Sequence, residues 1–161
     1  MNVKVVKNQK LNQMASPKQF QKKLQPLLNL KVIRGIVDQE TTKEQDLLID
    51  LKEAEFKKGD RPSGKPLGKY RSKTYAALKQ RMNPLAHGDV DLILTGSFIN
   101  SAFITKPTEG TYLFGFRDSK TNSLIERYGT DIKGLNQETF NGFQNNVIKP
   151  VLVEKIKARL K

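Results

Sequence analysis

The stretch Ser97-Phe-Ile-Asn-Ser-Ala-Phe-Ile-Thr105, followed after five residues by Thr111-Tyr-Leu-Phe-Gly-Phe116, decides the fold of this chain. Both runs are rich in β-branched and aromatic residues, and the break between them contains Pro107 and Gly110, which favour turns. The two runs therefore predict an antiparallel hairpin at about 97–116. Every other residue of the second run is aromatic, so the three rings share one face, which we expect to lie in the core.

Two helices are predicted before the hairpin. Ser16-Pro17-Lys18-Gln19 has the residues of a capping box with Pro at the first helical position, so a helix should begin at Pro17. Thr41 followed by Glu44 repeats the cap signal, and Gly59 is a suitable residue to end that second helix. The alternative is one long helix interrupted near Gly35.

A shorter helix and a further strand are expected between residues 73 and 94. Lys73–Met82 has helical spacing, with Tyr75, Leu78 and Met82 expected to face inward, and Asn83-Pro84 should stop it. The run from Val90 to Leu94 favours a strand.

The chain ends in a predicted amphipathic helix. After a short helix that Ser119 caps and Gly129 closes, apolar residues repeat at spacings of three and four from Phe140 to Leu160, with a kink expected at Pro150. We expect this helix to cover the hairpin. The predicted fold class is α+β, a small antiparallel sheet packed by N-terminal helices and a long C-terminal helix. It forms one domain at 16–161, preceded by a basic flexible arm at 1–15.

Composition excludes several classes of protein. The chain has 161 residues, no Cys and one His, so it has neither a disulfide framework nor a Cys-ligated zinc. No run approaches the roughly 20 apolar residues of a membrane span. The N-terminus lacks the apolar region of a signal peptide, so we expect a protein of the cytoplasm, or one assembled there.

The net charge of +13 is divided into blocks. Residues 1–37 carry eight bases and no acid, residues 38–56 sum to −5, and residues 57–81 sum to +8. The basic segment includes a loop predicted at 57–73, which is rich in Gly and Pro. This uneven field favours a polyanionic or acidic partner, although small intracellular proteins are often basic without binding nucleic acid.

Three motifs point weakly to chemistry. Gly59 to Lys65 has P-loop spacing, but Pro66 stands where a Ser or Thr would hold magnesium. His87, Asp89 and Asp91 are possible metal ligands, although acids at the start of a strand are usually solvated turn residues. Asp118-Ser-Lys120 fits a metal-dependent nuclease, or simply the start of a helix. We therefore predict no catalytic residue, no cofactor and no metal site, and the nuclease stays as an alternative.

Five segments carry a resemblance to a known group of proteins. Tyr75–Lys79, Asp91–Ser101, Thr111–Phe116 and Glu126–Thr130, followed by a long terminal helix, occur in the order seen in small structural proteins of tailed bacteriophages. The chain resembles the tail-completion and head-tail joining proteins of lambdoid-type phages and the virion-morphogenesis proteins of Mu-like phages. The resemblance covers about residues 70–161. The N-terminal 60 residues depart from it, because that family usually has a single helix there.

The resemblance implies a non-enzymatic subunit at the neck or tail of a virion: a head-tail connector, tail-completion protein or tail terminator. Such proteins form homo-oligomeric rings by head-to-tail packing and contact the portal, connector or tail proteins. Charge suggests which residues would meet a neighbouring copy: Glu44, Asp50, Glu53, Lys57, Lys58 and Arg61. Others would face packaged DNA without reading its sequence: Lys65, Lys69, Arg71 and Lys73. A basic DNA-binding accessory protein is the alternative, and no membrane partner is expected.

Overall fold

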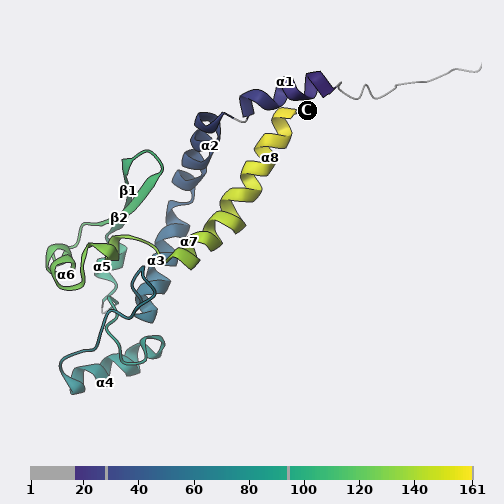
Figure 1. Cartoon of the computed structure of the whole chain (residues 1–161). Coiled ribbons are helices and arrows are strands. Elements are labelled where there is room, and N and C mark those ends of the chain that lie inside the picture. Colours follow the sequence, from purple (N-terminus) through teal and green to yellow (C-terminus); the bar gives the residue numbers. More distant parts are fainter. Residues whose placement is uncertain (1–16, 28, 94, 161) are drawn as a thin grey trace, which may run out of the picture.

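The computed structural model describes residues 17–27, 29–93 and 95–160, so the predicted arm at 1–15 lies outside the described residues. The fold is α+β: helices pack against one antiparallel hairpin, whose turn projects freely at one side of the molecule (Figure 1). In chain order the elements are α1 (Pro17–Leu27), α2 (Leu30–Lys43), α3 (Gln45–Lys58), α4 (Lys73–Met82), η1 (Pro84–Ala86), α5 (Ser97–Asn100), β1 (Ala102–Thr108), β2 (Thr111–Phe116), α6 (Thr121–Tyr128), η2 (Thr130–Lys133), α7 (Gln137–Phe143), the π-helical turn η3 (Gln144–Ile148) and α8 (Lys149–Leu160).

The hairpin packs its aromatic face on α3. Phe116 pairs with Ala102 and Phe114 with Ile104 across the two strands. Both phenylalanine rings are buried, whereas Tyr112, the third aromatic residue of β2, is half-buried. The ring of Phe56 from α3 lies 6.1 Å from that of Phe116, between centroids. A two-stranded sheet is marginal by itself in water, so this helix supplies the apolar cover that the hairpin needs.

The first half of the predicted hairpin is shorter as a strand than expected. Residues 97–100 form the single helical turn α5, and β1 begins only at Ala102. This turn buries both Phe98 and Ile99, which an extended strand would point to opposite faces. The strand expected from Val90 to Leu94 is also wrong, because residues 90–93 form no ladder and contribute to the core as an irregular segment.

The N-terminal helices divide at a different place from the one predicted. Thr41 is a buried residue inside α2, and the break falls at Glu44. Gly35 lies within α2 without interrupting it. Gly59 ends α3 as predicted, in a left-handed conformation with φ of 78°, and a side chain there would approach the carbonyl oxygen of Val90 to 2.8 Å.

The C-terminal helical run is continuous from α7 to α8, and the π-helical turn lies directly before Pro150. A proline cannot donate the backbone hydrogen bond of its turn, and the wider turn accommodates that loss. Phe143 and Ile148 join the core with the hairpin, whereas α8 packs along α1 and α2. The predicted cover of the hairpin therefore comes from the start of this run and from α3, and α8 is not part of it.

Helix α6 is closed by Gly129 as predicted, but Ser119 does not cap it. Oδ1 of Asp118 accepts a hydrogen bond of 2.8 Å from the backbone N–H of Lys120 at this end.

The molecule is elongated, with α4 at one end and α1 near the other (Figure 1). Within the described ranges, no helix combines the length and the apolar character needed to cross a bilayer.

Candidate interaction surface

Helix α4 and the turn η1 expose an apolar face to solvent. The exposed fractions are 36% for Tyr75, 51% for Leu78, 56% for Met82 and 58% for Leu85. The first three were predicted to face inward, and that prediction is wrong. Four large apolar side chains at helical spacing on one surface are typical of an interaction site rather than of isolated exposed residues.

Helix α4 does not bury its apolar stripe. The residues that face the rest of the protein are those one position further along the chain. Ala76 and Asn83 are half-buried and Lys79 is buried, and each follows a member of the stripe directly. One residue corresponds to about 100° around a helix. The helix is therefore rotated so that a small residue, a lysine and an asparagine meet the rest of the protein.

A buried ion pair explains this rotation. Nζ of Lys79 lies 2.6 Å from Oδ1 of Asp91, and the two side chains are 2% and 1% exposed. Nζ also donates to the carbonyl oxygen of Ile93 at 2.6 Å. A charge taken out of water needs an opposite charge and further hydrogen bonds, so Asp91 determines how α4 sits.

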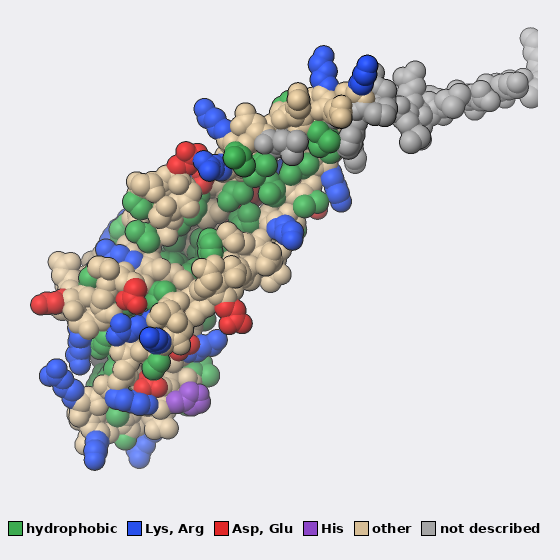
Figure 2. All heavy atoms as spheres, in the orientation of Figure 1, with side chains coloured by type: hydrophobic (Ala, Val, Ile, Leu, Met, Phe, Trp, Pro, Cys, Tyr) green, Lys and Arg blue, Asp and Glu red, His purple; other side chains and the backbone are tan. Residues whose placement is uncertain are grey.

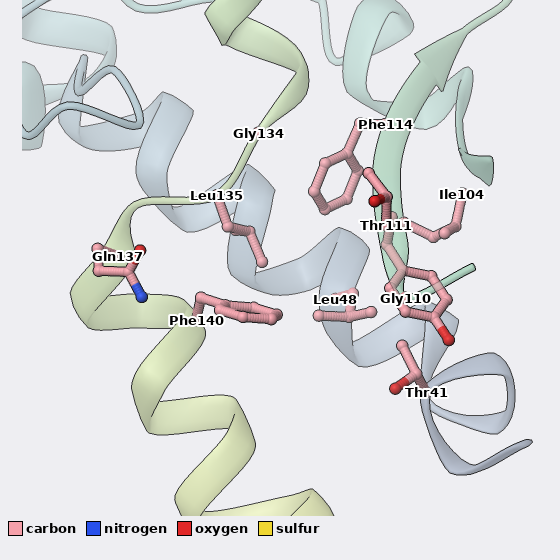
Figure 3. Close-up of a pocket in the computed structure, with 11 residues that line it drawn as sticks. Thr41, Leu48, Ile104, Gly110, Thr111, Phe114, Gly134, Leu135, Gln137 and Phe140 are labelled. Carbon is pink, nitrogen blue, oxygen red and sulfur yellow. The ribbon is translucent and has the colours of Figure 1, made fainter. Parts of the chain in front are cut away.

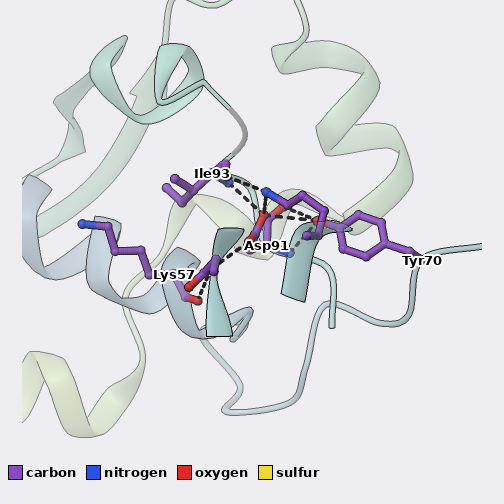
Figure 4. Close-up of polar contacts among 6 residues, drawn as sticks. Lys57, Tyr70, Asp91 and Ile93 are labelled. Carbon is purple, nitrogen blue, oxygen red and sulfur yellow. Dashed lines mark hydrogen bonds and ion pairs between the residues drawn. The ribbon is translucent and has the colours of Figure 1, made fainter. Parts of the chain in front are cut away.

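Asp91 is the centre of a small polar network (Figure 4). The hydroxyl of Tyr70 donates to Oδ1 at 3.1 Å, and Nδ2 of Asn83 donates to Oδ2 at 2.7 Å. The same Nδ2 donates to the carbonyl oxygen of Lys57 at 2.7 Å, which ties the network to the end of α3. Burial raises the pKa of the Tyr70 hydroxyl, so it stays protonated and able to donate.

Basic residues surround the end of the molecule that carries α4 (Figure 2). Five of them are exposed: Lys58, Lys65, Arg71, Lys73 and Arg81. Lys69 is also exposed, and its Nζ lies 2.7 Å from Oδ1 of Asp89. The four residues predicted to face DNA thus lie in the loop before α4 and at its first residue, beside the apolar stripe.

The acidic block is largely neutralised within the chain. Four of its seven carboxylates are ion-paired with a lysine: Asp38 with Lys106, Glu40 with Lys43 and Lys155, Glu53 with Lys57, and Glu55 with Lys52. Two residues predicted to meet a neighbour, Glu53 and Lys57, are 2.7 Å apart in the same helix. Among the described residues, Glu44, Asp46 and Asp50 make no ion pair.

The structure gives the residues of the metal alternative other partners, whereas Asp91 and Lys120 of the nuclease alternative line one pocket. Asp91 is committed to Lys79, Asp89 lies against Lys69, and His87 is exposed in a left-handed turn with φ of 49°. Asp91 is therefore a buried structural residue and not the solvated turn residue that its position suggested. In the part of the chain that the structure describes, no group of three or more His, Asp or Glu side chains is placed to hold a metal ion.

The helical arm formed by α1, α2 and α8 is a second region of incomplete burial. No residue of α8 is buried, although the helix carries Val151, Leu152 and Ile156, which are half-buried, and Val153, which is exposed. Hydrophobic side chains are visible between these helices on the molecular surface (Figure 2). The arm buries less apolar surface than helices in a globular core usually do.

The chain has no significant match among known protein families, curated proteins or solved structures.

Sequence patterns missed the exposed face of α4 because the residue that sets it is distant. The 75/78/82 stripe is a regular inward pattern on its own. One sequence signal existed: the stripe continues to Leu85, beyond Pro84, where the helix has ended. A core stripe normally stops with its helix, so this continuation indicated a surface that the whole segment shares.

Proposed function

We propose that this protein is a structural subunit that assembles head to tail with copies of itself, as a ring at the neck or tail of a tailed-phage virion. The observation that carries the proposal is the apolar face of α4 and η1, exposed at one end of an elongated chain. A heterologous contact joins different surfaces of successive copies, and it closes into a ring when the rotation between copies divides a full turn. Exposed bases around the apolar face would add specificity of orientation.

The buried ion pair supports the same proposal. Replacing a buried pair by apolar residues is often neutral or stabilising, so a fold that needed only stability would turn Leu78 and Met82 inward. Here the chain keeps Lys79 inside and these two side chains outside. Departures from local sequence rules of this kind are expected at functional surfaces.

Substitution of the apolar face tests the assembly. Leu78→Gln combined with Met82→Gln should abolish ring formation. The free energy of unfolding of the monomer should stay within about 1 kcal/mol of the parent value, because both side chains are exposed. Sedimentation velocity and negative-stain electron microscopy measure the assembly. Val153→Gln is the matched control on α8, where an exposed apolar residue is changed elsewhere.

Two results would count against the proposal. The parent protein could sediment as a monomer at every concentration, or the double variant could form rings as well as the parent does. Rings formed by the parent and lost in the double variant, but kept in Val153→Gln, would support it.

DNA binding is the second candidate, favoured by the exposed bases at the α4 end. It predicts that the chain binds duplexes of any sequence and that affinity falls steeply with salt. Replacing Lys65 and Arg71, which lie in the loop before α4, by Ala should then weaken DNA binding and affect sedimentation less than Leu78→Gln with Met82→Gln does.

A further inference from the structure

An apolar pocket opens between the hairpin, α3 and the start of α7 (Figure 3). Leu48 of α3, Ile104 of β1, Phe114 of β2 and Phe140 of α7 point into it, and Thr41 and Gln137 lie at its polar edges. Its volume is about 290 Å³. This volume is at the lower end of the range for small-ligand pockets, about 300–1,000 Å³, and the mostly apolar lining also suits one or two aliphatic side chains.

The exposed acids near this pocket have the opposite charge to the surroundings of α4. Glu109 precedes the lining residue Gly110 and is exposed, whereas Glu138, also exposed, lines a separate pocket with Glu55 and Lys58. Glu44 stands between Thr41 and Leu48 in the chain. In the described residues none of these three carboxylates forms an ion pair. Arg81, by contrast, lines a surface hollow together with Tyr75 and Leu78 of the apolar face of α4.

We infer that the pocket receives the α4 face of a neighbouring copy, with Leu78 or Met82 inserted between Phe114 and Phe140. This inference rests on the proposed assembly and names its two surfaces. No residue of α4 lines the pocket, and the two surfaces lie on different parts of the molecule. An apolar patch and a complementary pocket at different places on one chain generate a head-to-tail contact, because each copy offers one surface and receives the other.

Engineered disulfides test this pairing, and the absence of cysteine from the chain makes them specific. Leu78→Cys and Gln137→Cys are prepared as separate proteins, mixed at assembling concentration and oxidised. The mixed disulfide should exceed that between Leu78→Cys and Val153→Cys by about tenfold or more, because docking raises the effective concentration of the two thiols. Thr111→Cys, at another exposed edge of the pocket, replaces Gln137→Cys if the latter fails to fold.

Charge reversal gives a second measurement. Glu44→Lys with Glu109→Lys should reduce the mixed disulfide, and Arg81→Glu in the other partner should restore part of it.

The outcomes separate the inference from the proposed function. Rings with no enrichment of the mixed disulfide, or with Leu78→Cys linked mainly to itself, overturn the pairing and leave the assembly standing. A small molecule retained in the pocket in native mass spectra of the ring, with no cross-link, also overturns it. A parent protein that remains monomeric overturns both.

Discussion

At the scale of single residues, Asp91 has the widest influence on this molecule. Its carboxylate forms an ion pair with Lys79 and accepts hydrogen bonds from Tyr70 and Asn83. These partners come from the loop before α4, from α4 and from the residue that ends it. One buried carboxylate therefore fixes the position of the helix that carries the proposed interaction face.

Removing one member of the buried pair should cost much more stability than removing both. Asp91→Ala leaves the Lys79 charge buried and unpaired, and should lower the free energy of unfolding by about 3–5 kcal/mol. Lys79→Met combined with Asp91→Asn should lose clearly less than that. Urea unfolding followed by circular dichroism measures both.

Lys57→Ala is the control for this pair, because its ion pair with Glu53 lies on the exposed side of α3 and should contribute less than about 1 kcal/mol. A double variant as unstable as Asp91→Ala alone would show that Asp91 does not act through Lys79.

At the scale of elements, α2 joins the two halves of the fold through two carboxylates. Asp38 contacts Lys106 and Tyr112 of the hairpin, and Glu40 lies 2.5 Å from Nζ of Lys155 in α8. The hydrogen bond from Lys106 lowers the pKa of Asp38, and the one from Lys155 lowers the pKa of Glu40. Burial, together with the hydrogen bond to Asp38, raises the pKa of Tyr112 to about 12, so its hydroxyl donates throughout the physiological range.

These two carboxylates should make the fold sensitive to acid. A carboxyl whose pKa is lower in the folded than in the unfolded chain stabilises fully above the unfolded pKa, near 4, and stops doing so as the pH falls through the folded value. The urea midpoint should therefore fall between about pH 5 and about pH 2. In Asp38→Asn with Glu40→Gln the midpoint should be lower near pH 7 and should fall less on acidification.

Asp50→Asn serves as the comparison, because Asp50 is exposed on α3 and unpaired within the described residues. The urea midpoint of this variant should decrease at low pH as much as that of the parent does. If the urea midpoint of the Asp38 and Glu40 double variant decreases on acidification as much as that of the parent, other carboxylates cause the acid sensitivity.

The elements that the sequence predicted correctly are those with local signals. Gly59 ends α3 and Gly129 ends α6 through their own backbone conformations, and the alternation of aromatic residues along β2 places their rings on one face of the strand. The errors concern distant partners. Only the fold brings Asp91 to Lys79, and only the fold reveals that Glu53 already has Lys57 as its partner. A residue count cannot show which charges remain available to a neighbour.

At the scale of the whole molecule, the chain is long and thinly packed. Its core lies around the hairpin and α3, and both the helical arm and the α4 end expose apolar side chains. Such a shape has much surface for its volume, and neighbours in an assembly would bury part of that surface. The net charge of +13 would repel identical copies unless acidic surfaces of one meet basic surfaces of the next.

The prediction at this scale concerns a second pair of surfaces: the acidic residues Glu44, Asp50 and Glu53 of one copy and the basic residues at 57–61 of the next. Glu44, Asp50 and Glu53 changed to Lys should place like charges against Lys57, Lys58 and Arg61 of the next copy, and ring formation should fail. Reversing the three bases in the same chain should restore both the rings and the internal pair between positions 53 and 57. Sedimentation and electron microscopy give the readout.

The matched control reverses Glu126 and Glu154, which are exposed on α6 and α8, away from the proposed contact. These changes also make the chain more basic, so a general effect of net charge would weaken assembly in both variants. Rings lost only in the Glu44, Asp50 and Glu53 variant would place that acidic surface at the contact between copies. Rings that persist in it would mean that these carboxylates face another protein or solvent, because like charges held together at a partly desolvated contact would prevent assembly.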